Sequence, residues 1–132
     1  LLQGAHAAHD QRYFVLFRDV SEETKANLLE HTDVYLYPTE FEAFGFSVVE
    51  PMSYGKPVLT YDNTALPEVV GDGGICIPNN DVRLLAGALG DLLTDENKRS
   101  ELGKKGFNRW RDRFKPEVYA KNVLEIYEKS NI

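Results

Sequence analysis

The sequence predicts an α/β fold with a Rossmann-like parallel sheet, flanking helices and a C-terminal helical tail. Two observations lead to this prediction. Short apolar runs of strand length alternate with helical patterns up to Pro78, and only helical patterns follow it. Strands without polar alternation are usually covered on both faces, and strands that alternate with helices usually run parallel.

Four apolar runs are expected to form the strands, at residues 14–17, 34–37, 58–61 and 75–77. Between the first two, Ser21 is the expected N-cap of a crossover helix, and the two glutamates that follow it suit the positive end of that helix. The next helix is expected to end at Tyr54, because Gly55 can adopt a left-handed conformation and Pro57 blocks continuation. Strand, helix and strand therefore recur, as in a parallel sheet.

Three helices are expected after Pro78. Asp81 can cap the first, whose apolar residues recur at spacings of three and four and define one buried stripe: Val82, Leu85, Leu89 and Leu92. A second helix is expected from about Asp95 to Arg111. The third opens at Pro116, a favoured first-turn residue, and one face of it carries Tyr119, Val123 and Ile126.

The composition is that of one ordinary globular domain, with 132 residues of which 42% are hydrophobic and 27% charged. A net charge of −6 argues against a protein that binds nucleic acid by neutralising phosphates. The only cysteine, Cys76, lies in an apolar run and is expected in the core, which suits a reducing compartment. His6 and His9 lack acidic or cysteine partners nearby, so no metal site is expected.

Residues 41–50, FEAFGFSVVE, form the candidate functional segment. They follow an expected strand, and open parallel sheets bind ligands at the carboxyl ends of their strands. Gly45 permits a backbone conformation or a close ligand approach that other residues resist. A helix that starts near Ser47 favours a bound phosphate at its first turn, and Glu50 can accept hydrogen bonds from two ribose hydroxyls. The segment therefore suits a sugar nucleotide.

The same residues also allow purely structural interpretations. Ser47 and Glu50 fit a capping box, in which the glutamate bonds to the backbone of its own helix. Glu42 can be a solvated loop residue, and Phe44 and Phe46 can be plugs of the hydrophobic core. The segment alone leaves both interpretations open.

The motifs between residues 33 and 78 follow one another in a fixed order: Asp33-Val34, Pro38-Thr39, Glu42-Ala43-Phe44-Gly45, Glu50, Gly55, Pro57-Val58 and Leu66-Pro67-Glu68-Val69-Val70-Gly71. In order and spacing they resemble the donor-binding half of retaining glycosyltransferases with the GT-B fold, most closely family 4. This resemblance favours the sugar-nucleotide interpretation over the structural one.

The resemblance implies roles for the candidate residues. Glu50 would bind the ribose hydroxyls of a nucleoside-diphosphate sugar, and Glu42 would lie near the transferred sugar as the catalytic carboxylate. Backbone N–H groups of Phe44, Gly45 and Phe46 would contact the sugar and the distal phosphate. The resemblance implies neither a metal nor a cofactor, because the helix terminus and basic side chains take the role of a metal.

The resemblance also implies an organisation for the chain. Residues 1–114 would form an N-terminally incomplete donor-binding lobe, and residues 115–132 a C-terminal helix. The chain has no initiator methionine, and residues 1–20 contain neither the acceptor-binding lobe nor the Arg and Lys pair that clamps the diphosphate in relatives. We therefore expect a longer enzyme, of which these residues alone are inactive.

Three residues depart from the family pattern: Ala43 and Ser47 replace a usual glycine and proline, and Arg18, where glycine is usual, has no assigned role. Two alternatives to a transferase stay open. One is a sugar-nucleotide epimerase or glycan phosphorylase of the same fold, and the other is a non-enzymatic nucleotide-binding or interaction module. No signal peptide is found, so a cytoplasmic location is expected.

The expected tail contains aromatic and basic residues with structural interpretations. Its aromatic residues are expected to pack the helices together: Phe107, Trp110 and Phe114. Its basic cluster is expected to be a solvated face, with contact to anionic lipid at the cytoplasmic membrane face as the alternative: Lys104, Lys105, Arg109, Arg111 and Arg113. Pro67 and Glu68 are expected to begin a helix rather than to border the nucleotide.

Overall fold

A computed structural model describes residues 15–130 and confirms the predicted α/β fold. Its sheet has three parallel strands in sequence order: β1 (Tyr35–Tyr37), β2 (Val58–Asp62) and β3 (Gly74–Pro78). In the register of the sheet, Tyr37 lies beside Thr60, and Thr60 beside Cys76. The carboxyl ends of all three strands therefore meet at one edge of the sheet.

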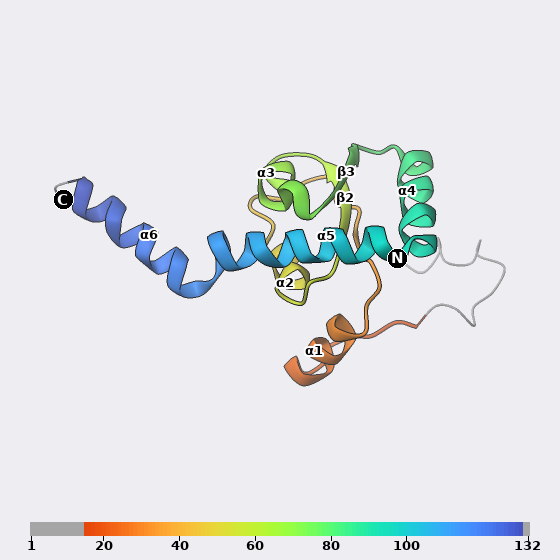
Figure 1. The fold of residues 1–132 in the computed structure, drawn as a ribbon, viewed down its shortest axis with the longest axis horizontal. Coiled ribbons are helices and arrows are strands. Elements are labelled where there is room, and N and C mark those ends of the chain that lie inside the picture. The colour runs from red at the N-terminus through yellow and green to blue at the C-terminus, as the bar shows by residue number, and fades with distance from the viewer. Residues whose placement is uncertain (1–14, 131–132) are drawn as a thin grey trace.

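The described residues form six α-helices: α1 (Glu22–Glu30), α2 (Phe46–Ser53), α3 (Leu66–Val70), α4 (Val82–Thr94), α5 (Glu96–Arg109) and α6 (Pro116–Lys129). A 3-10 turn follows α3 at Gly71–Gly73, and a π-helical turn follows α5 at Trp110–Phe114. Figure 1 shows α5 crossing beside the sheet and α6 continuing away from it. The predicted tail of three helices is confirmed.

Predicted capping residues begin and end these helices. The Ser21 hydroxyl accepts a hydrogen bond from the Thr24 N–H at 3.2 Å, and a carboxylate oxygen of Asp81 accepts one from the Leu84 N–H at 2.9 Å. Gly55 follows α2 with φ +66°, a left-handed conformation that ends the helix. The local sequence therefore determines where these helices begin and end.

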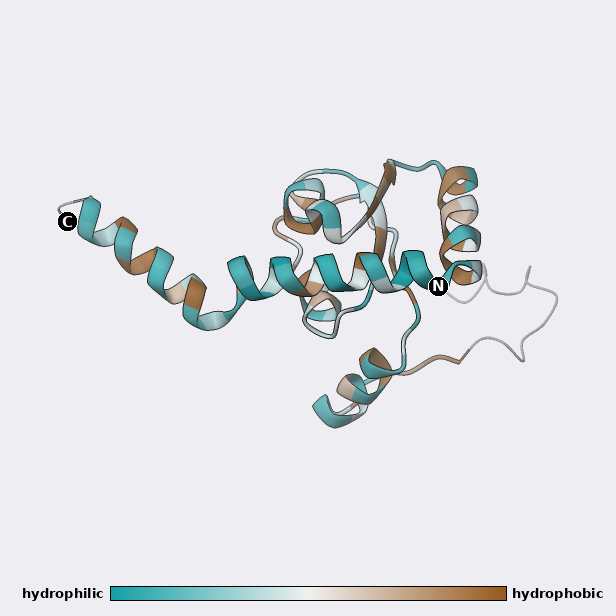
Figure 2. Ribbon diagram, viewed as in Figure 1, coloured by the Kyte–Doolittle hydropathy of each residue, from teal (hydrophilic) through white to brown (hydrophobic). Residues whose placement is uncertain are grey.

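The central strand β2 is buried on both faces, as its apolar sequence predicts. One face packs with α2 and α3 in a cluster of Val48, Val49, Met52, Val58, Leu66, Val69 and Val70. The other face packs with α4 in a cluster of Leu59, Tyr61, Leu85 and Leu92. Figure 2 shows hydrophobic residues concentrated in the sheet and along α4, whereas α5 is mostly hydrophilic.

The prediction of a strand at residues 14–17 is wrong for residues 15–17, which the structure describes. Phe14 lies outside the described residues, and Val15 to Phe17 form no strand and are more than half exposed. A strand needs a neighbouring strand for its backbone hydrogen bonds, and within residues 15–130 the outer edge of β1 has none. The apolar run alone was not enough to make a strand.

The stripe of α4 is less buried than predicted, and the predicted apolar face of α6 is largely exposed. In α4, Leu85 and Leu92 are buried and Leu89 packs against them, but Val82, the first residue of the helix, is 67% exposed. In α6, Tyr119 and Ile126 are 57% and 63% exposed. Within the described chain, α6 has no buried residue, because it leads away from the core after Lys115 (Figure 1).

Candidate active site

The loops that follow the three strands are tied together at the carboxyl edge of the sheet. The side-chain amide of Asn63, just after β2, donates a hydrogen bond to the Thr39 carbonyl at 2.6 Å. The same amide lies 3.4 Å from the carboxamide oxygen of Asn79, just after β3. Because one side chain joins three loops, the segment from Thr39 to Gly45 is held against the sheet at the edge where parallel sheets bind ligands.

Glu42 is fixed in this segment through both its backbone and its side chain. The Thr64 hydroxyl donates to the Glu42 carbonyl, and the Tyr37 hydroxyl donates to a Glu42 carboxylate oxygen at 2.9 Å. The Phe44 N–H lies 3.4 Å from the other carboxylate oxygen. Glu42 is therefore half-buried and oriented, and not the freely solvated loop residue of the structural interpretation.

These hydrogen bonds keep Glu42 charged. The Tyr37 hydroxyl is the main cause of a pKa of Glu42 below its ordinary value, and the backbone N–H groups of Phe44, Gly45 and Ala43 act in the same direction. Partial removal from water opposes them and is the weaker effect. Glu42 is thus a carboxylate that stays ionised well below neutral pH, as a group that stabilises positive charge must.

Gly45 turns the chain into α2. Its φ of +105° is a conformation that L side chains rarely adopt, and an added Cβ would lie 3.1 Å from Leu66 and 3.3 Å from Val48. Gly45 is the N-cap of α2, which begins at Phe46, so Ser47 lies inside the helix. The capping-box interpretation of Ser47 and Glu50 is therefore wrong, because the helix begins before the serine.

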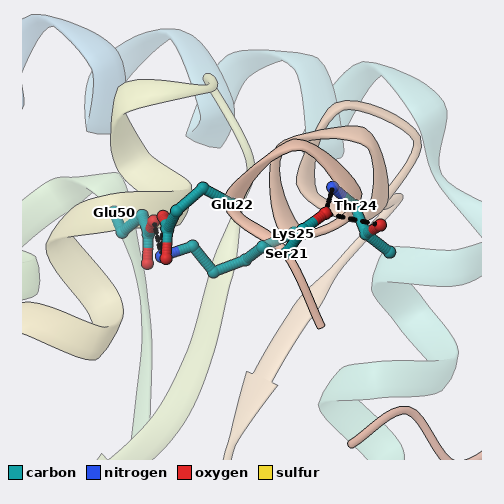
Figure 3. A network of polar contacts seen from close by, with 5 residues as sticks. All are labelled: Ser21, Glu22, Thr24, Lys25 and Glu50. Carbon is teal, nitrogen blue, oxygen red and sulfur yellow. Dashed lines mark hydrogen bonds and ion pairs between the residues drawn. The ribbon is translucent and has the colours of Figure 1, made fainter. Parts of the chain in front are cut away.

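Glu50 lies one turn into α2 and forms an ion pair with a residue of α1. Its carboxylate is 2.9 Å from the Nζ atom of Lys25, which also lies 2.8 Å from the carboxylate of Glu22 (Figure 3). Hydrogen bonds to Glu22 and then to Glu50 raise the pKa of Lys25 above its ordinary value. Lys25 could not be recognised from the sequence as a partner of Glu50, because the two residues lie in different helices.

The two phenylalanines of the turn are at the surface. Phe46 is 72% exposed and Phe44 36%, with their ring centres 4.6 Å apart, so their interpretation as core plugs is wrong. The Phe44 ring meets Phe114 edge-on at 6.1 Å. Together with Pro116 and Tyr119, these three rings line a shallow apolar hollow of about 220 Å³ beside the candidate site.

The basic cluster of the tail is not entirely a solvated face. The Arg109 guanidinium donates from Nε to the Val69 carbonyl at 2.8 Å and from Nη2 to the Glu68 carbonyl, so it caps the last turn of α3. Burial is the main cause of the lowered pKa of Arg109. Pro67 lies in the first turn of α3, as predicted.

Other predicted residues have structural positions. Trp110 and Phe114 pack against the cluster that contains Val48, as expected for a packing face, whereas Phe107 is 39% exposed. Cys76 also packs against that cluster, and burial raises the pKa of its thiol to about 11, so the thiol is protonated at neutral pH. Arg18 is exposed in the segment before α1, and nothing in the structure assigns it a role.

Residues 15–130 contain neither a candidate metal site nor a candidate membrane-spanning helix. No group of three or more histidine, cysteine, aspartate and glutamate side chains is placed there to hold a metal ion, and His6 and His9 lie outside this range. In the same range, no helix combines the length and the apolar character needed to span a bilayer.

A comparison with protein families shows to which family this chain belongs. The sequence model of the family described as glycosyl transferases group 1 matches residues 5–109. The chain belongs to this family. The fold and the order of its motifs agree with the GT-B resemblance of the sequence.

Relatives of this glycosyltransferase chain carry related names. It is 34% identical over 114 residues to an MMP alpha-(1->4)-mannosyltransferase of Mycolicibacterium hassiacum, over 84% of this chain and 28% of the relative. It is 32% identical to the alpha-1,3/1,6-mannosyltransferase ALG2 of Dictyostelium discoideum, over 83% and 26%. It is 34% identical to a phosphatidyl-myo-inositol mannosyltransferase of Mycobacterium leprae, over 83% and 30%. The chain thus spans under a third of the length of these curated relatives.

Proposed function

We propose that this chain supplies the donor site of a retaining glycosyltransferase, which moves a sugar from a nucleoside-diphosphate sugar to an acceptor. The observation that carries the proposal is the Glu42 carboxylate, which the Tyr37 hydroxyl holds in its charged form directly before the N-terminus of α2. A fixed negative charge and a helix N-terminus side by side suit a reaction in which positive charge develops on a sugar and negative charge on a leaving phosphate.

The Glu42 carboxylate and the N-terminus of α2 act on the same bond of the donor. The bond between the anomeric carbon and the diphosphate oxygen breaks, its electron pair leaves with the diphosphate, and the sugar passes through an oxocarbenium-like state. The acceptor oxygen then bonds to the anomeric carbon on the same face, as its proton is released. We assign Glu42 to the positive sugar, and the N–H groups of Phe44, Gly45 and Phe46 to the sugar and the distal phosphate.

Glu50 is assigned to the ribose of the donor. It lies one helical turn beyond the proposed phosphate position, and only one of its carboxylate oxygens is paired with Lys25 at 2.9 Å. The second oxygen is the acceptor that we assign to the ribose hydroxyls. In this proposal the donor requires neither a metal nor a resident cofactor, since helix N–H groups and basic side chains of the complete enzyme balance the diphosphate.

The names of the relatives suggest which substrates to test first. Because the three relatives described above are named as mannosyltransferases, we propose mannose as the transferred sugar. One of them is named for a lipid acceptor, phosphatidyl-myo-inositol, so we also propose a cytoplasmic enzyme that meets its acceptor at the membrane face. The acceptor-binding lobe is the proposed partner of the residues described here.

The experiment compares Glu42→Ala with the wild type in the full-length protein. Nucleoside-diphosphate affinity is measured by calorimetry, and transfer is measured at saturating nucleoside-diphosphate mannose. We expect turnover to fall by roughly a hundredfold or more, because one electrostatic contact to the transition state is lost. Affinity for the free diphosphate should stay nearly unchanged, because that product carries no sugar.

The other outcomes argue against this assignment. Equal losses of affinity and turnover would place Glu42 in nucleotide binding. No loss in either would make it a structural residue of the loop. A donor that is epimerised, or cleaved by inorganic phosphate, without transfer to any acceptor would replace the transferase with the epimerase or phosphorylase alternative.

A further inference from the structure

Lys25 connects helix α1 to helix α2. Helix α1 lies apart from the sheet, and α2 packs against it (Figure 1). The Lys25 ammonium crosses between them to the Glu50 carboxylate at 2.9 Å, and it meets Glu22 of its own helix at 2.8 Å (Figure 3). The Glu50 contact is therefore a tertiary contact, whereas the Glu22 contact is local to α1.

Lys25 is not needed to hold the fold together. The side chains of Lys25 and Glu50 are 38% and 43% exposed, and ion pairs this exposed contribute little to stability. Two other contacts attach the C-terminal end of α1: the buried side chain of Leu29, and a hydrogen bond from the Lys56 ammonium to the Glu30 carbonyl at 2.7 Å. The Lys25 contact therefore contributes little to stability, and its effect on the Glu50 carboxylate can be tested in a folded protein.

The ion pair limits the freedom of a ligand-binding carboxylate. A glutamate side chain on a helix surface samples several rotamers, and a ligand that needs one of them must order it on binding. Lys25 holds one carboxylate oxygen of Glu50, so the other is left in a fixed direction. Binding of a ribose diol to that oxygen therefore costs less free energy, because the Glu50 side chain is already ordered.

We propose that Lys25 is a positioning residue for Glu50, holding its carboxylate in the orientation that binds the two ribose hydroxyls of the donor. This inference rests on the proposed function, in which Glu50 binds the ribose. It adds to that function a residue of a different helix, which acts through Glu50 and does not touch the ribose. Removing Lys25 should therefore weaken recognition of the ribose hydroxyls and no other part of the nucleotide.

The test measures discrimination between two nucleotides in the full-length protein. The probes are the tightest-binding of GDP, UDP and ADP, and its 2′,3′-dideoxy counterpart, which lacks both hydroxyls. We expect Glu50→Gln to lower the ratio of the two affinities by about tenfold or more. Lys25→Met should lower the same ratio by about two- to tenfold, as expected when a side chain is no longer pre-ordered. Lys25→Arg keeps the positive charge and should keep the affinity ratio close to that of the wild type.

Lys105→Met is the matched control. Lys105 also forms an ion pair, with Glu101 at 2.7 Å, and its side chain is 44% exposed, but both residues lie in α5. Its loss should leave the affinity ratio unchanged. Thermal unfolding of all variants shows whether each is folded before its affinities are compared.

The outcomes separate the two proposals. If Glu50→Gln lowers the ratio and Lys25→Met leaves it unchanged, or lowers both affinities equally, the positioning role of Lys25 is overturned and Glu50 keeps its role. If Glu50→Gln leaves the ratio unchanged, or if none of the three diphosphates binds, the ribose role of Glu50 is wrong, and the role of Lys25 is wrong with it.

Discussion

The two glutamates of the candidate site are held by partners of opposite character. Neutral donors, the Tyr37 hydroxyl and the turn N–H groups, surround Glu42, whereas the charged ammonium of Lys25 holds Glu50. A neutral donor stabilises a carboxylate without cancelling its charge, so Glu42 keeps a negative field for a positive sugar. A cation cancels much of that field, which suits Glu50 for binding uncharged hydroxyls.

Tyr37→Phe should change the pH dependence of transfer. The Tyr37 hydroxyl is the main cause of the lowered pKa of Glu42, so without it that pKa rises toward its ordinary value. Because the proposed reaction requires ionised Glu42, the acid limb of the kcat/KM profile should move to higher pH. By linkage, the stability that Glu42 contributes is present above its unfolded pKa and is lost as pH falls through its folded pKa.

The control for this prediction is Tyr54→Phe, which removes the hydroxyl of a 39% exposed tyrosine that follows α2. The profile of this variant should coincide with that of the wild type. An acid limb that stays in place after Tyr37→Phe would show that Glu42 does not control the reaction in that pH range.

The candidate residues that could be proposed from the sequence lie close together in the chain, between Glu42 and Glu50. The turn at Gly45 was predictable, because a glycine between two phenylalanines at the end of a strand marks an unusual backbone, and its φ of +105° agrees. Tyr37 and Lys25 were missed as partners of Glu42 and Glu50. Both are ordinary residues of a strand and a helix, and only side-chain direction and the packing of α1 give them a role.

At the scale of elements, α5 packs closely because it has glycines at its contacts. A Cβ on Gly103 would overlap the carbonyl oxygen of Gly55, and a Cβ on Gly73 would overlap Gly106 of α5. These contacts bring the helix against the loop after α2 and the turn before β3. The position of α2, and with it Glu50, therefore depends on α5.

Gly103→Ala should destabilise the protein by about 3 kcal/mol, because a methyl group at a backbone contact forces two elements apart. Gly90→Ala is the matched variant in α4, where an added Cβ meets nothing within 4 Å. It should stabilise the protein by about 0.5 to 1 kcal/mol, the advantage of alanine over glycine in a helix. Urea unfolding measures both changes.

Equal effects of these two substitutions would contradict the close contact between α5 and the loop after α2. If Gly103→Ala is the more destabilising, as expected, nucleotide affinity should also fall, since α2 moves. Gly90→Ala should leave the affinity unchanged, because α4 packs on the other face of the sheet.

Predictions of helices and strands succeeded where residues close in sequence determine the structure. They failed where the structure depends on contacts with other elements. The caps at Ser21, Asp81 and Gly55 are encoded within a few residues, and the helices begin or end there. The run at residues 15–17 has the composition of a strand, but a strand also requires a paired edge. In the same way, a helical stripe is buried only where another element covers it, as α6 shows.

At the scale of the molecule, α6 exposes apolar side chains to solvent. Four of its large apolar residues are more than half exposed: Tyr119, Leu124, Ile126 and Tyr127. Neighbouring apolar residues on a single helix usually pack against another element. The division into a lobe at residues 1–114 and a helix at 115–132 stays a prediction, although the chain does turn away from the core after Lys115 (Figure 1).

Expressed alone, these 132 residues should bind a nucleoside diphosphate weakly and should not transfer sugar in multiple turnovers. The relatives named as mannosyltransferases align with this chain over only 26% to 30% of their length, so their activity belongs to much longer proteins. A transferase must hold two substrates together, and bringing them together accounts for a large part of its rate. In our proposal, Glu42, Glu50 and the N-terminus of α2 serve one substrate, the donor. Calorimetry with GDP, UDP and ADP, together with a transfer assay beside the full-length protein, measures both expectations. Multiple-turnover transfer by the 132 residues would show that they also hold the acceptor, and the proposed separate acceptor-binding lobe would then be unnecessary.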